Sequence, residues 1–204
     1  MSGVSPEALW ALGRGAGVVL LVLLSTTVLL GLLTRSGRPA PGLPRFAVTI
    51  VHRNASLLSV VFLALHIGTL YFDPYAQLSL VDVVVPFLGS YQPFWLGLGT
   101  LALDLTVAVV VTSLLRARLG PRVFTVVHRA VYALWPVAVA HSLGTGTDAG
   151  SAWFLVVLAC CVVPVAAAVA WRVNAGFVEH AHRRTGAAPD RRLDPAPSRE
   201  AARP

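Results

Sequence analysis

Lysine is absent from this chain of 204 residues, and charge of either sign is scarce. All 16 basic residues are arginine, and charged residues make up 12% of the sequence, which is about half the share in a typical soluble domain. Hydrophobic residues make up 56%. So little charge in so apolar a chain excludes an ordinary soluble domain and favours an integral membrane protein that forms one bundle.

Cysteine is also scarce, with only the adjacent residues Cys160 and Cys161 inside an apolar run. Adjacent cysteines have neither the spacing of a zinc site nor that of a disulfide framework, so we expect both to be small buried hydrophobic residues. The net charge of +7 could suggest a nucleic-acid partner. The placement of the arginines argues instead for contact with lipid, and we expect no nucleic acid.

Five apolar runs are long enough to cross a bilayer, which takes roughly 20 residues. They cover residues 15–33, 54–72, 94–115, 123–143 and 152–171. Backbone polar groups in lipid must pair within their own segment, so the runs are expected to be helices, the second extending back past His52. The first run is longer than the apolar core of a signal peptide, so it is expected to be retained. The sequence predicts an all-α membrane bundle over residues 1–172 and a disordered basic tail over residues 173–204.

The connections between these runs alternate in their arginine content. The first and third connections and the tail are rich in arginine, whereas residues 73–93 and 144–151 contain none. The positive-inside rule therefore predicts a cytoplasmic C-terminus and an outer N-terminus. The protein is expected to be a multi-pass protein of the plasma membrane whose basic face meets the anionic inner leaflet.

Two of the runs contain histidine pairs, in segments that both begin with Val-His-Arg. VHRNASLLSVVFLALH contains His52 and His66, and VHRAVYALWPVAVAH contains His128 and His141. These two runs are separated by one other run, so they cross the membrane in the same direction. His52 and His128 then lie at the cytoplasmic level and His66 and His141 at the outer level, roughly 20 Å away.

A pair of facing imidazoles at each level indicates a metal cofactor. Buried imidazoles in a membrane need partners, and two of them suit a haem with two histidine ligands. Zinc is less suitable, because each level lacks the further ligands of a tetrahedral site. The 13-residue step from His128 to His141 leaves a mismatch of roughly 140° on a straight helix. We therefore expect a distortion around Trp135 and Pro136.

Arginine follows each histidine at the cytoplasmic level. Arg53 and Arg129 could pair with haem propionates in the bidentate manner that suits guanidinium. They could equally be ordinary flanking charges that contact lipid phosphates.

Four acidic residues have no assigned role. Asp73, Asp82 and Asp148 lie near the outer level and could gather ferric ions or dock a basic partner, although solvated loop carboxylates are the simpler expectation. Asp104 lies within the third run, where a hydrogen bond between helices is favoured over a proton relay.

The histidine spacing on two helices separated by one resembles the ferric reductase-like transmembrane domain family. This family includes the membrane haem domains of NADPH oxidases and ferric reductases and the haem subunit of the methionine sulfoxide reductase system. SYQPFWLGLGTLALDL, TSLLRARLG and HSLGTGTD are similar to bacterial single-domain members. The resemblance implies two b-type haems, one ligated by His52 and His128 and the other by His66 and His141. Oxidases of the family usually have an additional leading helix.

The resemblance also implies transmembrane electron transfer by an oxidoreductase component. After residue 171 the sequence contains no G-x-G-x-x-G and no room for a dinucleotide-binding fold. Electrons are therefore expected to come from a separate flavin reductase or from quinol and to leave for an unknown acceptor at the outer face. The rival interpretation is a non-redox transporter or channel whose histidines relay protons or bind a metal ion.

Overall fold

The computed structural model describes residues 5–36, 44–76 and 78–173. The helices are α1 (Pro6–Ser36), α2 (Arg45–Phe72), α3 (Leu80–Val84), α4 (Pro93–Leu114), α5 (Arg116–His128), α6 (Val131–Thr145) and α7 (Ala152–Val173). The described ranges contain no strand, which confirms the predicted all-α class. The predicted tail lies outside the described residues, except for its first residue, which ends α7.

The predicted membrane spans are confirmed by length and composition. Four helices can each cross a bilayer, namely α1, α2, α4 and α7, and α5 with α6 can form a fifth span that is bent by 46°. Both α1 and α2 begin nine residues before the apolar runs predicted at 15–33 and 54–72. Polar residues at their ends do not stop a helix whose backbone bonds are already internal.

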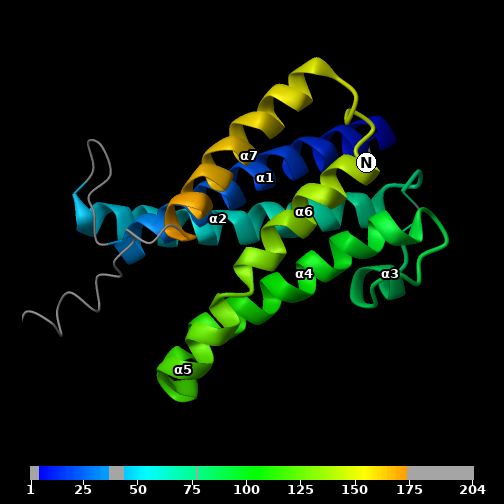
Figure 1. Ribbon diagram of the computed structural model, residues 1–204. Coiled ribbons are helices and arrows are strands. Elements are labelled where there is room, and N and C mark those ends of the chain that lie inside the picture. Colours follow the sequence, from blue (N-terminus) through cyan, green and yellow to red (C-terminus); the bar gives the residue numbers. More distant parts are fainter. Residues whose placement is uncertain (1–4, 37–43, 77, 174–204) are drawn as a thin grey trace, which may run out of the picture.

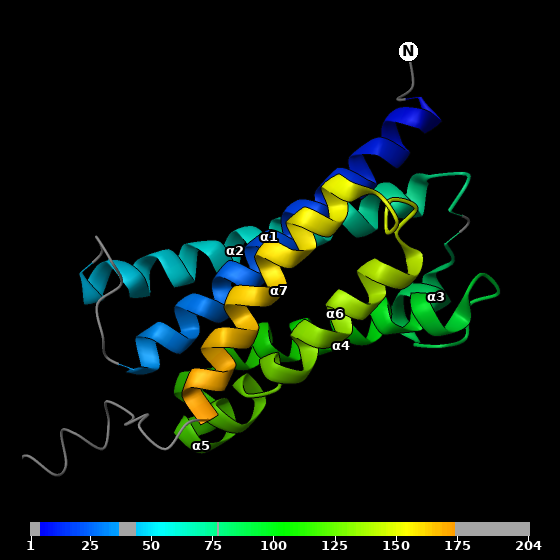
Figure 2. The same ribbon diagram turned by 45° about the horizontal axis from the view of Figure 1, so that its top comes forward.

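The helices form two groups that face each other, as Figures 1 and 2 show. Helix α1 lies along α2 and also contacts α7, while α4 packs against α6 and α5. Helix α1 joins the groups through contacts with α6. The backbones of α2 and α6 hardly come close to each other. The histidine-bearing segments therefore face each other across the bundle without packing directly.

The buried apolar core lies mainly between α1 and α7. One cluster contains Leu21, Phe154, Leu158 and Cys161, and a second contains Val28, Leu32 and Val165. The cysteine prediction is confirmed for Cys161, which is buried, and wrong for Cys160, which is exposed. Neighbouring helical residues point roughly 100° apart, so only one of the two faces α1.

A hydrogen bond ties α6 to α1 in the middle of the bundle. The indole Nε1–H of Trp135 donates to the Oγ of Ser25 over 2.9 Å, and that hydroxyl donates to the carbonyl of Leu21 over 2.8 Å.

Trp135→Phe removes this hydrogen bond, so it should lower the free energy of unfolding by about 1 kcal/mol, or the melting temperature by about 2–4 °C. Thermal unfolding in detergent measures this. Trp153→Phe, which removes a half-exposed indole instead, is the control and should have the melting temperature of the wild type. An equal fall in melting temperature in both variants would contradict a stabilising hydrogen bond from Trp135 to Ser25.

Candidate functional site

The structure brings the four predicted histidines together in two pairs. The ring centroids of His52 and His128 are 6.4 Å apart, with 73° between the ring planes. Those of His66 and His141 are 6.5 Å apart, with 83° between the planes. Helix α2 supplies His52 and His66, α5 ends on His128, and α6 supplies His141.

Both separations fit two imidazoles on opposite sides of one metal ion. An imidazole nitrogen binds a transition metal at roughly 2.0–2.1 Å and lies roughly 1.1 Å from its ring centroid. Two such rings with one ion between them have centroids roughly 6.3 Å apart. Each ring could turn about its bond to such an ion, so the observed angles of 73° and 83° between the planes would be compatible with this arrangement. The two pairs are therefore spaced as bis-histidine ligation requires.

Three of the four rings are held by backbone carbonyls through Nδ1. His52 contacts the carbonyl of Thr27 at 3.0 Å, His66 that of Gly13 at 2.7 Å, and His141 that of Trp95 at 2.9 Å. A carbonyl oxygen only accepts, so each Nδ1 carries the hydrogen and donates it. This leaves Nε2 as the basic nitrogen of the neutral ring, which is how metal-binding histidines are usually oriented.

The same three rings also lie against glycines, which leave room for them. A Cβ at Gly17 would lie 2.9 Å from Cε1 of His66, and one at Gly99 would lie 2.5 Å from Cε1 of His141. At Gly31 the corresponding distance to Cε1 of His52 is 3.3 Å. Any side chain at positions 17 or 99 would push the imidazole out of its place.

We call each combination of carbonyl and glycine a cradle, and each cradle has the same spacing. The acceptor carbonyl stands at position i and the glycine at i+4, one helical turn later: 13 and 17, 27 and 31, 95 and 99. The two cradles on α1 are 14 residues apart, as are His52 and His66 on the antiparallel α2. Sequence reasoning missed the cradles, although this repeated 14-residue spacing was available as a signal.

His128 is the exception among the four. Its Nδ1 is buried and has no hydrogen-bond partner among the described residues. None of the described glycines faces its ring. The ring instead stacks on Phe124, with 5.1 Å between centroids and 26° between planes. Packing rather than a cradle orients this histidine.

The predicted distortion of the fourth span exists, but it begins before Trp135 and Pro136. The bend separates α5 from α6 at Arg129 and Ala130, and Pro136 lies within α6. A proline ring crowds the carbonyl four residues earlier, here Tyr132, which lies inside α6, so Pro136 does not account for the break at Arg129 and Ala130.

Tight turns at this break help to bring His128 and His141 onto one side. Hydrogen bonds there join residues i and i−3, as from Ala130 to Val127 and from Ala133 to Ala130, both 2.9 Å. Each residue in such a turn rotates roughly 120° instead of roughly 100°, which reduces the mismatch in phase. The bend of the segment adds to this correction.

A cavity of about 370 Å³ lies at the pair His66 and His141. Helices α1, α2, α4 and α6 all contribute to its walls, which include His66, His141, Leu63 and Leu103. Such a volume lies in the range of cofactor and ligand sites. The connection over residues 73–93 supplies Tyr75 and other wall residues.

The acidic residues have separate structural roles. Asp73 is only 2% exposed and accepts from the backbone amide of Tyr75 over 2.9 Å. Asp82 caps α3 through Ser79, and Asp148 pairs with Arg14. The expectation of solvated carboxylates is thus wrong for Asp73, whereas Asp148 is partly exposed and ion-paired.

No metal cluster collects these acids. Within the described ranges, no group of three or more His, Cys, Asp or Glu side chains could hold a metal ion. Asp104 is exposed on α4, and the described residues offer it no hydrogen bond, so the predicted bond between helices is wrong.

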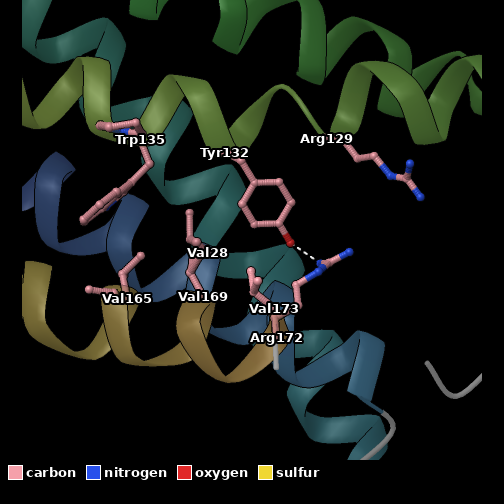
Figure 3. A pocket seen from close by; sticks show the side chains of 10 residues that line it. Val28, Arg129, Tyr132, Trp135, Val165, Val169, Arg172 and Val173 are labelled. Atoms are coloured by element: carbon pink, nitrogen blue, oxygen red, sulfur yellow. Dashed lines mark hydrogen bonds between the residues drawn. The ribbon is translucent and has the colours of Figure 1, made fainter. Parts of the chain in front are cut away.

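Each of the two predicted arginines directly follows a histidine of the pair His52 and His128. Arg53 follows His52 on α2 and is exposed, and Arg129 lies in the break after His128, also exposed. Arg129 lines a groove beside α7 (Figure 3).

Comparisons with known proteins identify one family. Searches against curated proteins and against solved structures gave no match. The family model described as ferric reductase like transmembrane component matches residues 16–139, more than half of the chain. The match includes His52, His66 and His128 and ends two residues before His141. With its membrane helices and paired histidines, the chain belongs to the ferric reductase-like transmembrane component family.

Proposed function

We propose that this protein conducts electrons across the membrane through two b-type haems, an inner one ligated by His52 and His128 and an outer one by His66 and His141. The supporting observation is the pair of centroid distances, 6.4 and 6.5 Å, each matching two imidazoles around one ion. Membership of a membrane redox family supports the same assignment. The two levels are roughly 20 Å apart along α2.

The protein residues set the conditions for electron transfer. When bound, each haem supplies a one-electron carrier whose iron has no open position. The Nδ1 hydrogen bonds of His52, His66 and His141 fix the rings and make Nε2 a better ligand. Apolar helices around them exclude water.

Arg53 and Arg129 are proposed as partners of the inner haem's propionates. Each follows an inner ligand directly, and guanidinium pairs with carboxylate in a bidentate manner. With the arginine-rich connections in the cytoplasm, electrons would move outward against an inside-negative potential. That direction is favourable by about 2.3 kcal/mol per 100 mV.

The donor is proposed to be a separate flavin reductase or quinol on the cytoplasmic side, and the acceptor a molecule at the outer face of a bacterial plasma membrane. The match to a membrane redox family supports an electron donor of this kind.

The test is the optical spectrum of the purified protein. We expect reduced-minus-oxidised bands of low-spin haem b, with two haems per chain by pyridine haemochrome assay. A folded but colourless protein would contradict the proposal and favour the transporter or channel.

The two haems should be separable by mutation. His66→Ala removes a ligand of the outer pair only, so the outer haem should be lost and about half of the haem absorbance should remain, since the levels are roughly 20 Å apart. His52→Ala is the matched variant for the inner haem. Equal loss of both haems from either folded variant would contradict the separate pairs.

A further inference from the structure

The connection between α2 and α4 exposes an apolar surface. Residues 78–93, which include α3, contain a single charged residue, Asp82. Its carboxylate accepts from the backbone amide and the hydroxyl of Ser79 over 2.9 and 2.8 Å, in a capping box that begins α3. A cluster of exposed apolar side chains marks a surface that contacts a partner or a membrane. Here the large apolar side chains that are 41% to 66% exposed are Leu80, Val81, Val84, Val85, Phe87 and Leu88.

Helix α4 holds this connection in place. The hydroxyl of Thr100 donates to the backbone carbonyl of Asp82 over 2.6 Å. Phe87 has a left-handed φ of 68°, and a Cβ at Gly97 would lie 2.6 Å from its backbone nitrogen. Such a conformation is unfavourable for a bulky residue and persists only where the surrounding packing maintains it. Contacts with α4 therefore decide which side of the connection is exposed.

The same contacts decide how deep the connection lies. Helix α4 has 22 residues, so it needs nearly its whole length to cross a bilayer. Thr100 lies seven residues after Pro93, where α4 begins, which is roughly 10 Å along the helix. It is adjacent to Gly99, whose Cα faces the ring of His141. Helix α3 is therefore level with His141, beside α4 rather than beyond its end, as Figures 1 and 2 show.

The two sides of the connection have different surroundings. Val83 lines the cavity of about 370 Å³, whereas the neighbouring Val84 is 65% exposed. On the exposed side the ring of Phe87 stacks on that of Phe94 of α4, with 6.3 Å between the centroids, and Phe94 is itself 59% exposed. The connection is thus a wall of the cavity, and its exposed side continues the surface of a membrane span.

We propose that α3 and the residues up to Leu88 lie in the membrane and insert their exposed apolar side chains among lipid acyl chains. The connection then separates the cavity from lipid. Acyl chains are the partner rather than lipid phosphates, because residues 73–93 contain no basic residue.

The hydrogen bonds of α3 suit a place in lipid, where backbone polar groups need partners within the protein. The amide of Ser79 is bonded to the carboxylate of Asp82, and the amide of Val83 donates to the carbonyl of Ser79 over 3.3 Å. The carbonyl of Asp82 accepts from Thr100. A protein that docks from water suits this surface less well, because the surface lies beside α4 at the level of His141.

The experiment places spin labels on single cysteines of the full chain in nanodiscs, in a Cys160→Ala, Cys161→Ala background. Oxygen concentrates among acyl chains and a nickel chelate concentrates in water. At Val84→Cys we expect oxygen to relax the label severalfold more than the chelate does, as at Val163→Cys, half-way along α7 and 64% exposed. At Gly150→Cys, in the connection between α6 and α7, a Cβ meets nothing within 4 Å, and the chelate should have the larger effect.

Two results would overturn the proposal. Equal behaviour of Val84→Cys and Gly150→Cys would place the surface in water and favour docking of another protein. Weak effects of both reagents at Val84→Cys would show that protein covers the surface and favour a second copy of this chain.

A charge on the same surface gives a test without labels. Val84→Asp should lower the melting temperature in nanodiscs by about 4 °C, because a carboxylate among acyl chains is costly. Ser90→Asp, at an exposed polar position of the same connection, should melt at the wild-type temperature. A wild-type melting temperature for Val84→Asp would also overturn the proposal. Neither test depends on haem, so failure here is distinguishable from failure of the proposed function.

Discussion

Gly17→Val should leave the chain with one haem in place of two. A Cβ at this position would lie 2.9 Å from Cε1 and 3.0 Å from Nδ1 of His66, and valine adds two further methyl groups. Helix α1 lies along α2 and cannot recede without losing that packing. The ring of His66 must therefore leave both the cradle and its place opposite His141.

The measured quantity is outer-haem occupancy, from haem content and redox titration. We expect it to fall below about a tenth of the wild-type value, equivalent to roughly 1.4 kcal/mol or more. Gly15→Val is the matched control, because the same substitution on the same helix meets nothing within 4 Å. Unchanged outer haem in Gly17→Val, or equal loss in both variants, would show that the cradle does not position His66.

The membrane helices and the histidine pairs could be predicted because both are one-dimensional patterns. Apolar length marks a span, and the residue count between His52 and His66 fixes their common face. The level at which each histidine lies follows from the direction of its span. The structure then supplies the ring separations, which depend on how α2 and α6 are held apart.

The cradles were missed, because the 14-residue spacing that they share with His52 and His66 gains a meaning only when α1 is known to lie along α2. Glycine is common in membrane helices, so Gly17 and Gly31 within an apolar run do not stand out until the opposite helix is known. The contact between Arg14 and Asp148 could not be predicted either. These two residues are 134 positions apart in sequence and form an ion pair because the fold brings their helix and loop together. The distortion of the fourth span was misplaced because the sequence offers Pro136 as the obvious kink, whereas the bend lies at Arg129 and Ala130, before the turn on which that proline acts.

Carbon monoxide should bind to only one of the two haems in the reduced protein, the inner one. The ligand that gives way is His128, because it alone lacks a cradle. Its Nδ1 is buried without a partner among the described residues, and only Phe124 stacks on its ring. A metal-binding histidine without its outer hydrogen bond is a weaker and less firmly oriented ligand.

Because α4 and α6 pack antiparallel, the place where a cradle for His128 would lie can be found on α4. Trp95 and Gly99 serve His141, so a cradle for His128, 13 residues earlier, would lie about 13 residues further along α4, near Ala108 and Thr112. There the hydroxyl of Thr112 donates to the carbonyl of Ala108 over 2.7 Å. The adjacent Ser113 engages the carbonyl of Val109 over 2.6 Å. The carbonyls of Ala108 and Val109 thus already accept hydrogen bonds from side-chain hydroxyls, and threonine stands at position 112 where the other cradles have glycine.

Optical titration of dithionite-reduced protein with carbon monoxide tests this difference. Wild type should convert about half of its haem, since one iron of two loses a histidine ligand. His66→Ala, which keeps only the inner haem, should convert nearly all of it, and His52→Ala, which keeps only the outer haem, should convert almost none. Conversion of the outer haem, or of neither, would show that His128 is held as firmly as the three cradled histidines.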